Sequence, residues 1–148
     1  MDSRPETYDH ILKFQGYLHE VIQVLQERQL FHDTSKLVSP EVEYYDKVTE
    51  KLAGLTYGSP EYKDGLKELG PAIEHHYANN RHHPESHKNG IRDMTLIDIM
   101  EMLCDWTAAS HRHNDGNIRK SIEINQERFG YSDELKQILK NTVQALGF

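Results

Sequence analysis

The histidines are the residues that first point to chemistry. The chain has 148 residues, of which 10 are histidine. Five of them lie close together in the sequence: His75, His76, His82, His83 and His87. Neutral imidazole is the commonest protein ligand for transition metals, and it also transfers protons near neutral pH. The pair His32-Asp33 adds an oxygen donor that suits the same ions. These residue types predict a metal site if the fold brings the segments together.

Two further polar residues lie beside the apolar stripe of a predicted helix. They are His19, in a helix over residues 6–29, and Asp105, in the middle of Met-Leu-Cys-Asp-Trp. A carboxylate beside buried apolar side chains is costly unless it is paired or binds a metal. Asp98 lies on nearly the same helix face, but the pattern Thr95-Leu-Ile-Asp98 predicts a helix cap instead. We therefore expect Asp105, rather than Asp98, to face a functional site.

The histidine-rich stretch raises two questions of orientation. Adjacent residues on a helix point about 100° apart, so His75 and His76 cannot face the same point, and His76 lies closer to the apolar face. His83 precedes Pro84, so we expect extended backbone and a side chain directed away from that of His82. One of these two would bind a metal and the other would hydrogen-bond a substrate.

The elements that position these residues are all predicted to be helices. After the helix over residues 6–29, the sequence shows start signals at Ser39-Pro40, Ser59-Pro60, Pro71, Thr95, about residue 117 and Ser132. Residues 79–93 have the composition of a loop. Strand-like alternation and internal repeats are absent from the sequence. We predict an all-α single domain over residues 1–148, a helical bundle of about six to seven helices.

The last of these helices is amphipathic. Its apolar residues are Leu135, Ile138, Leu139, Val143 and Leu146. They would pack inside the domain or against a second copy in a homodimer.

Composition excludes several classes of protein. With 17 basic and 24 acidic residues, the formal net charge is −7, which argues against non-specific nucleic-acid binding. No apolar run reaches the roughly 18–20 residues that span a membrane. The N-terminus lacks the pattern of a signal peptide. The single cysteine, Cys104, excludes an internal disulfide and fits a reducing compartment, so we expect a cytoplasmic protein.

Taken in order, His19, His32-Asp33 and Asp105 resemble the ligand set of the HD-domain metal-dependent phosphohydrolases. In that family a histidine, an HD pair and a distant aspartate surround one metal. The run His32-Asp-Thr-Ser-Lys36 is similar to the HDxxK form of many members. HHPESHKNGI followed by MLCDWTAAS is distantly similar to the HD-GYP branch, but the GYP tripeptide is missing, so cyclic-di-GMP specificity is not implied. The resemblance covers residues 19–110 and is stronger to small HD-like proteins of phages and bacteria.

This resemblance implies a metal-dependent phosphohydrolase that acts on a nucleotide or another small phosphate ester, either a monoester or a diester. A first divalent ion would be held by four residues: His19, His32, Asp33 and Asp105. A second ion would be held by His76, His82 and His83, with Asp33 bridging the two. One or two ions of Mn, Fe, Zn, Ni or Co suit such ligands.

The resemblance also gives roles to residues around the metal. Lys36 would stabilise negative charge that develops on a phosphoryl group, and Asp33 would take part in catalysis as the bridging ligand. Arg81 and Lys88 would bind the substrate phosphate, with His87 at the rim of the site. Glu85 would support catalysis by orienting a metal-binding histidine.

Two other functions use the same residues. The HD scaffold also carries di-iron oxygenases, whose irons use the same histidine and aspartate ligands. A non-catalytic module that binds a nucleotide or a partner is the third hypothesis, although buried imidazoles and carboxylates without a metal are costly.

Overall fold

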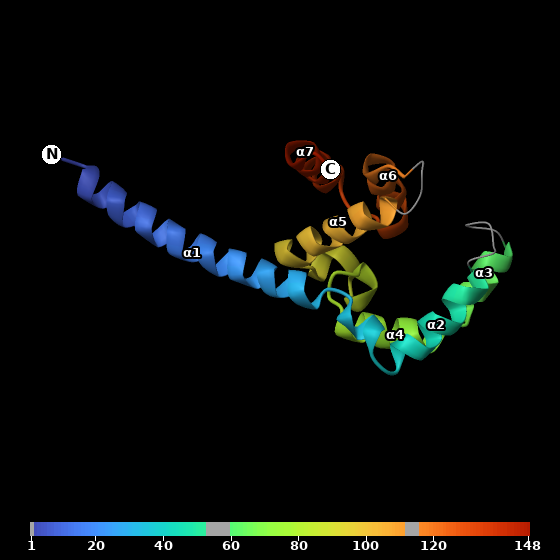
Figure 1. Ribbon diagram of the computed structural model, residues 1–148. Helices are drawn as coiled ribbons and strands as arrows, with labels where there is room; N and C mark the ends of the chain where they lie inside the picture. Colours follow the sequence, from blue (N-terminus) through green and yellow to red (C-terminus); the bar gives the residue numbers. More distant parts are fainter. Residues whose placement is uncertain (1, 53–59, 112–115) are drawn as a thin grey trace. The chain divides into compact units, whose positions relative to one another are not determined.

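Every element that the structure describes is helical (Figure 1). The computed structural model describes residues 2–52, 60–111 and 116–148, and these ranges contain no β-strand. The α-helices are α1 (Arg4–Phe31), α2 (Glu41–Leu52), α3 (Pro60–Lys67), α4 (Gly70–Asn79), α5 (Leu96–Ser110), α6 (Ile118–Phe129) and α7 (Asp133–Leu146). Short 3-10 helices are η1 (Thr34–Leu37), η2 (Pro84–Ser86) and η3 (Gly90–Asp93). The predicted all-α fold is confirmed.

The chain divides into two compact units, Met1–His32 and Asp33–Phe148, where the sequence alone predicts one domain over residues 1–148. The first unit consists of α1, which has a proline in its first turn and matches the helix predicted over residues 6–29. At its end, the backbone N–H of His32 donates to the carbonyl of Arg28 at 2.8 Å. None of the residues of α1 is buried.

The main core of the second unit lies among α5, α6 and α7. Its buried residues are Leu103, Ile118, Ile122, Tyr131, Leu139 and Val143. The rings of Trp106 and Phe129 stack nearly parallel at this core, with centroids 6.2 Å apart. Gly130 ends α6 with a φ of 65°, a left-handed conformation that favours glycine. Because Leu139 and Val143 are buried here, the amphipathic last helix packs inside the chain.

Helices α2 and α4, with η1, form the part of the second unit that positions the candidate site. α2 packs against η1, α3 and α4. It begins at Glu41, directly after Pro40, and α4 begins at Gly70, directly before Pro71, as the proline signals predict. From Gly54 the sequence also predicts that α2 ends near that residue, which lies outside the described residues.

The segment between α4 and α5 is irregular apart from η2 and η3, as its loop composition predicts. The capping box that opens α5 is confirmed, with Thr95 and Asp98 each accepting a hydrogen bond from the other's backbone N–H. Asp98 is fully buried in this role. Of the helices described, none offers a stretch of the length and apolarity that crossing a membrane requires.

Candidate metal centre

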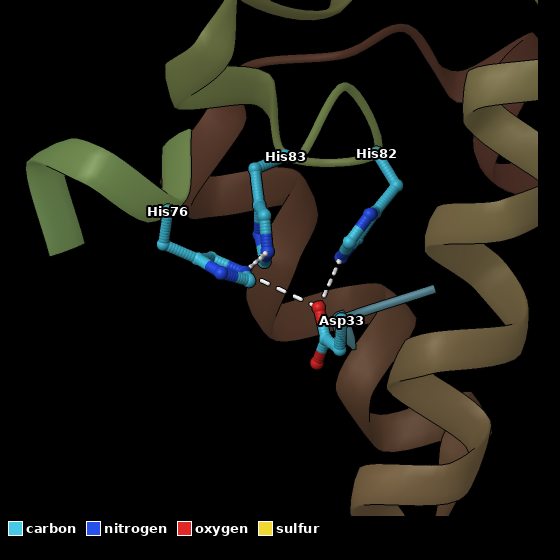
Figure 2. Close-up of side chains that lie close together, drawn as sticks. All are labelled: Asp33, His76, His82 and His83. Carbon is cyan, nitrogen blue, oxygen red and sulfur yellow. Dashed lines mark hydrogen bonds and ion pairs between the residues drawn. The ribbon is translucent and has the colours of Figure 1, made fainter. Parts of the chain in front are cut away.

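Asp33, His76, His82 and His83 come from three segments of the chain and meet at one point (Figure 2). We call these residues the four-donor cluster. Asp33 directly precedes η1, His76 lies on α4, and the other two histidines lie between α4 and η2. Asp33 has a φ of 56°, in the left-handed region that few residues other than glycine adopt. Aspartate adopts this region more often than most residues, and backbone positions of this kind cluster at functional sites.

The ligand atoms of the cluster are close to one another. Each residue offers one nitrogen or carboxylate oxygen, and these atoms all lie within 4.8 Å of one another. Asp33 Oδ1 is 3.3 Å from His76 Nε2 and 3.4 Å from His82 Nε2. His83 Nε2 is 2.9 Å from His76 Nε2 (Figure 2). Three imidazole nitrogens and one carboxylate oxygen form a donor set that fits Mn, Fe, Co, Ni or Zn better than Ca or Mg.

Buried carboxylates lie behind two of these histidines. Glu41 Oε2 is 2.9 Å from His76 Nδ1, and Glu101 Oε1 is 3.1 Å from His82 Nδ1. Burial acts to raise the pKa of Glu41, but hydrogen bonds, of which that with His75 is the strongest, outweigh it and lower this pKa. Metal-binding histidines commonly have such a carboxylate partner on the second ring nitrogen.

The third histidine of the cluster is kept neutral. Burial, followed by the charges of His82 and His76, lowers the pKa of His83 to about 3. A neutral imidazole has a nitrogen lone pair to give to a cation. His83 is therefore in the protonation state that a metal ligand needs at neutral pH.

Comparison with known proteins shows the family. Residues 1–145 match the family described as "Family of unknown function (DUF5662)". The chain belongs to the DUF5662 family. Neither the curated proteins nor the solved structures gave a significant match. The description of DUF5662 names no activity, so function has to be inferred from the residues of the site.

A cation and a tyrosine lie beside the cluster of this DUF5662 member. Lys36 Nζ is 2.6 Å from Asp33 Oδ2 and 5.5 Å from the centroid of the Tyr45 ring. Burial, followed by the charges of Glu41 and Asp33, raises the pKa of Tyr45 to about 12. Its hydroxyl therefore keeps its proton throughout the physiological range. Lys36 occupies a position next to the cluster, as its predicted role requires.

The ligands predicted for a first metal are found in both units. Asp105, on α5, lies at the cluster: its carboxylate reaches within 4.8 Å of that of Asp33, and its charge acts to raise the pKa of His83. His19 is exposed on α1, and His32 follows the last residue of that helix. The ligand roles of His19 and His32 stay predictions.

Three residues predicted to bind substrate have other contacts. Arg81 Nη2 forms an ion pair with Asp98 Oδ2 at 3.3 Å. His87 Nε2 is 2.8 Å from the backbone carbonyl oxygen of Arg81, and Lys88 is exposed. These contacts give Arg81 and His87 a role in holding the loop, and their binding roles stay predictions.

The expected orientation of His83 is wrong. Its backbone is extended, with φ −95° and ψ 129°, as Pro84 predicts. However, the rings of His82 and His83 lie together, with centroids 4.0 Å apart. The alternation of side chains expected for extended backbone does not apply, because His82 lies in a turn. Both histidines thus reach the cluster.

The carboxylates behind the histidines were missed by sequence reasoning. Glu85, predicted to orient a histidine, instead forms an ion pair with Arg128 at 2.6 Å, while Glu41 and Glu101 contact the ring nitrogens. Glu101 could have been identified from the sequence, because it lies four residues before Asp105 on the same helix face. Glu41 could not, since an acidic residue in the first turn of a helix is common and does not indicate a functional site.

Proposed function

We propose that the chain is a metal-dependent phosphohydrolase that acts on a small phosphate ester, with nucleotides as the first candidates. The observation that carries the proposal is the convergence of three imidazole nitrogens and the Asp33 carboxylate within 4.8 Å of one another. Imidazoles and carboxylates that are brought together in a partly buried site are costly without a cation to share. Support for phosphate chemistry comes from the HD pair and from Lys36 next to it.

Asp33, His76, His82 and His83 are the residues that would hold the ion, and its candidates are Mn, Fe, Zn, Ni and Co. When bound, such an ion supplies Lewis acidity and lowers the pKa of water. The position of Asp105 near Asp33 is compatible with a second ion that shares the Asp33 carboxylate.

The chain's own residues supply the remaining requirements of phosphoryl transfer. Lys36 carries a positive charge 2.6 Å from the Asp33 carboxylate, where it can stabilise negative charge on a phosphoryl oxygen. Tyr45, which lies against Lys36, keeps its proton and is available to donate it in a hydrogen bond. Both residues belong to the same unit as the cluster, so their spacing does not depend on α1.

The direct test is phosphate or nucleoside release from a panel of mono-, tri- and cyclic nucleotides, with Mn²⁺, Fe²⁺, Co²⁺ or Zn²⁺ added. The matched variants are Asp33→Ala and His82→Ala, with His10→Ala, an exposed histidine of α1, as the control. We expect release by the wild-type protein and the control, and loss of release in both cluster variants.

Other outcomes would point to other functions. Equal release by the wild-type protein and both cluster variants would disprove the proposal. Metal-dependent oxygen consumption without phosphate release would favour the oxygenase hypothesis, and tight nucleotide binding without any product would favour a binding module. The single cysteine fits a reducing compartment, so a cytoplasmic location is part of the proposal.

A further inference from the structure

Two carboxylates that are largely shielded from solvent face histidines of the four-donor cluster. Glu41 is fully buried, and Glu101 is 9% exposed. Each faces the Nδ1 atom of a cluster histidine, at 2.9 Å for His76 and 3.1 Å for His82. A carboxylate accepts hydrogen bonds. In both rings Nδ1 lies closer to its glutamate oxygen than Nε2 lies to Asp33 Oδ1, where the distances are 3.3 Å for His76 and 3.4 Å for His82. The shorter contact assigns the hydrogen to Nδ1.

The hydrogen on Nδ1 also determines whether Nε2 of the same ring carries a hydrogen or a lone pair. A neutral imidazole carries one hydrogen, so a hydrogen on Nδ1 leaves a lone pair on Nε2. In both histidines Nε2 is the atom directed at Asp33 Oδ1, at 3.3 and 3.4 Å (Figure 2). The lone pairs therefore point at the place where the donors converge.

The contacts around His76 agree with this assignment. Asn80 Nδ2 is 3.0 Å from His76 Nδ1, which would compete if the amide donated to the ring. However, the same amide donates to Ser35 Oγ at 2.8 Å and to the His76 carbonyl at 2.9 Å. Both of its hydrogens are used there. Ser35 Oγ also lies 3.3 Å from His76 Nδ1, but the Ser35 hydroxyl donates to the Glu41 carboxylate. Glu41 is therefore the acceptor for His76 Nδ1.

We propose that Glu41 and Glu101 are positioning residues that hold His76 and His82 as Nδ1–H tautomers, and that they thereby set the affinity of the cluster for a divalent transition-metal ion. This inference rests on the metal-binding part of the proposed function and is independent of the reaction catalysed. The same contacts hold the orientation of the two rings toward the point where the donors converge.

The variants that test this are Glu41→Gln and Glu101→Gln. Glutamine keeps the shape of the side chain but presents an amide, whose NH₂ can donate to Nδ1 and so favours the opposite tautomer. In Glu41→Gln one of two rings must face the NH₂ group, because Glu41 Oε1 also faces His75 Nδ1 at 2.7 Å. The amide has one oxygen for the two rings. Glu43→Gln, an exposed residue of the same helix, is the matched control.

Two measurements are made on each full-length protein. The first is the dissociation constant of Zn²⁺, from competition with a chromophoric chelator. We expect each glutamine variant to bind Zn²⁺ about 10–100-fold more weakly than the wild-type protein, and the control to bind it equally well. The second is the long-range ¹H–¹⁵N spectrum of the metal-free histidine rings at about pH 8, above their ordinary pKa.

The spectrum separates positioning from general support of the fold. We expect Nδ1–H signals for His76 and His82 in the wild-type protein, and loss of that preference only at the histidine whose carboxylate is replaced. Unchanged tautomers, or unchanged Zn²⁺ affinity in both glutamine variants, would overturn the inference. If the wild-type protein binds no Zn²⁺, both this inference and the metal-binding part of the proposed function are refuted. If Zn²⁺ binds tightly to every variant, only the positioning role is refuted.

Discussion

Replacing His82 by alanine gives the sharpest test of whether the cluster binds a metal. The ring is 1% exposed, and it contacts Asp33 on one side and Glu101 on the other. The substitution removes one of the four donors and leaves Glu101 facing a cavity. Without metal, we expect the variant to be less stable than the wild-type protein by about 1–3 kcal/mol, since a buried carboxylate loses one of its contacts.

The metal-dependent part of the effect can be calculated separately. An ion at 100 times its dissociation constant stabilises the folded state by about 2.7 kcal/mol. If the loss of a direct ligand weakens binding by about 100-fold, the same ion concentration stabilises the variant by only about 0.4 kcal/mol. For a chain of this size, 1 kcal/mol corresponds to about 2–4 °C in the unfolding midpoint. We therefore expect a shift of about 5–11 °C for the wild-type protein and about 1–2 °C for His82→Ala.

The assay is thermal unfolding followed by circular dichroism, with and without Zn²⁺ or Mn²⁺. Comparing each protein with itself cancels the loss of stability that the substitution causes in the metal-free state. His10→Ala, at an exposed position of α1, should behave as the wild-type protein. An equal metal-induced shift in the wild-type protein and in His82→Ala would refute the reasoning, as would the absence of any shift in the wild-type protein.

The remaining predictions address acid stability, charge stabilisation and the core. The pKa of His83 is about 3 in the folded state, against an ordinary 6.5. Between these pH values the His83 side chain is protonated in the unfolded chain and neutral in the folded chain. The free energy of unfolding should therefore fall as the pH falls from about 6.5 towards 3. Urea unfolding at several pH values should show that this free energy depends less on pH in His83→Gln than in the wild-type protein. Lys36→Met should lower kcat for phosphate-ester hydrolysis by about 10²-fold, as loss of one charge-stabilising donor does elsewhere, without weakening Zn²⁺ binding. Equal kcat in the two proteins would exclude that role. Ile122→Ala, at a fully buried core position, should cost about 2–5 kcal/mol in urea unfolding and leave the Zn²⁺ affinity of the folded protein unchanged.

Most of the helices could be predicted because their signals are local. Proline near the first turn, the Thr95–Asp98 capping box and Gly130 at a helix end act within a few residues, and the structure has helix boundaries at each of them. Apolar periodicity identifies α7 in the same way, but it does not identify the partner. Only the structure shows Leu139 and Val143 buried against α5 and α6.

The candidate site could be predicted in residue type more than in arrangement. Asp33, His76 and both histidines of the loop were selected from chemistry and sequence position, and the structure brings them together. The mutual orientation of His82 and His83 was not predictable from Pro84, because the turn at His82 depends on how the loop packs.

The sequence by itself determined the all-α class, the helix boundaries near proline and glycine, and the presence of metal-binding residue types in several segments. Backbone sterics, capping and periodicity act over a few residues, so a single sequence carries them. Only the tertiary structure decided which donors share one point and which carboxylates support them. Glu41 is 35 residues from His76 in the chain, and nothing local couples the two. Their contact depends on the packing of α2 against α4, which aligns a buried carboxylate with a ring nitrogen.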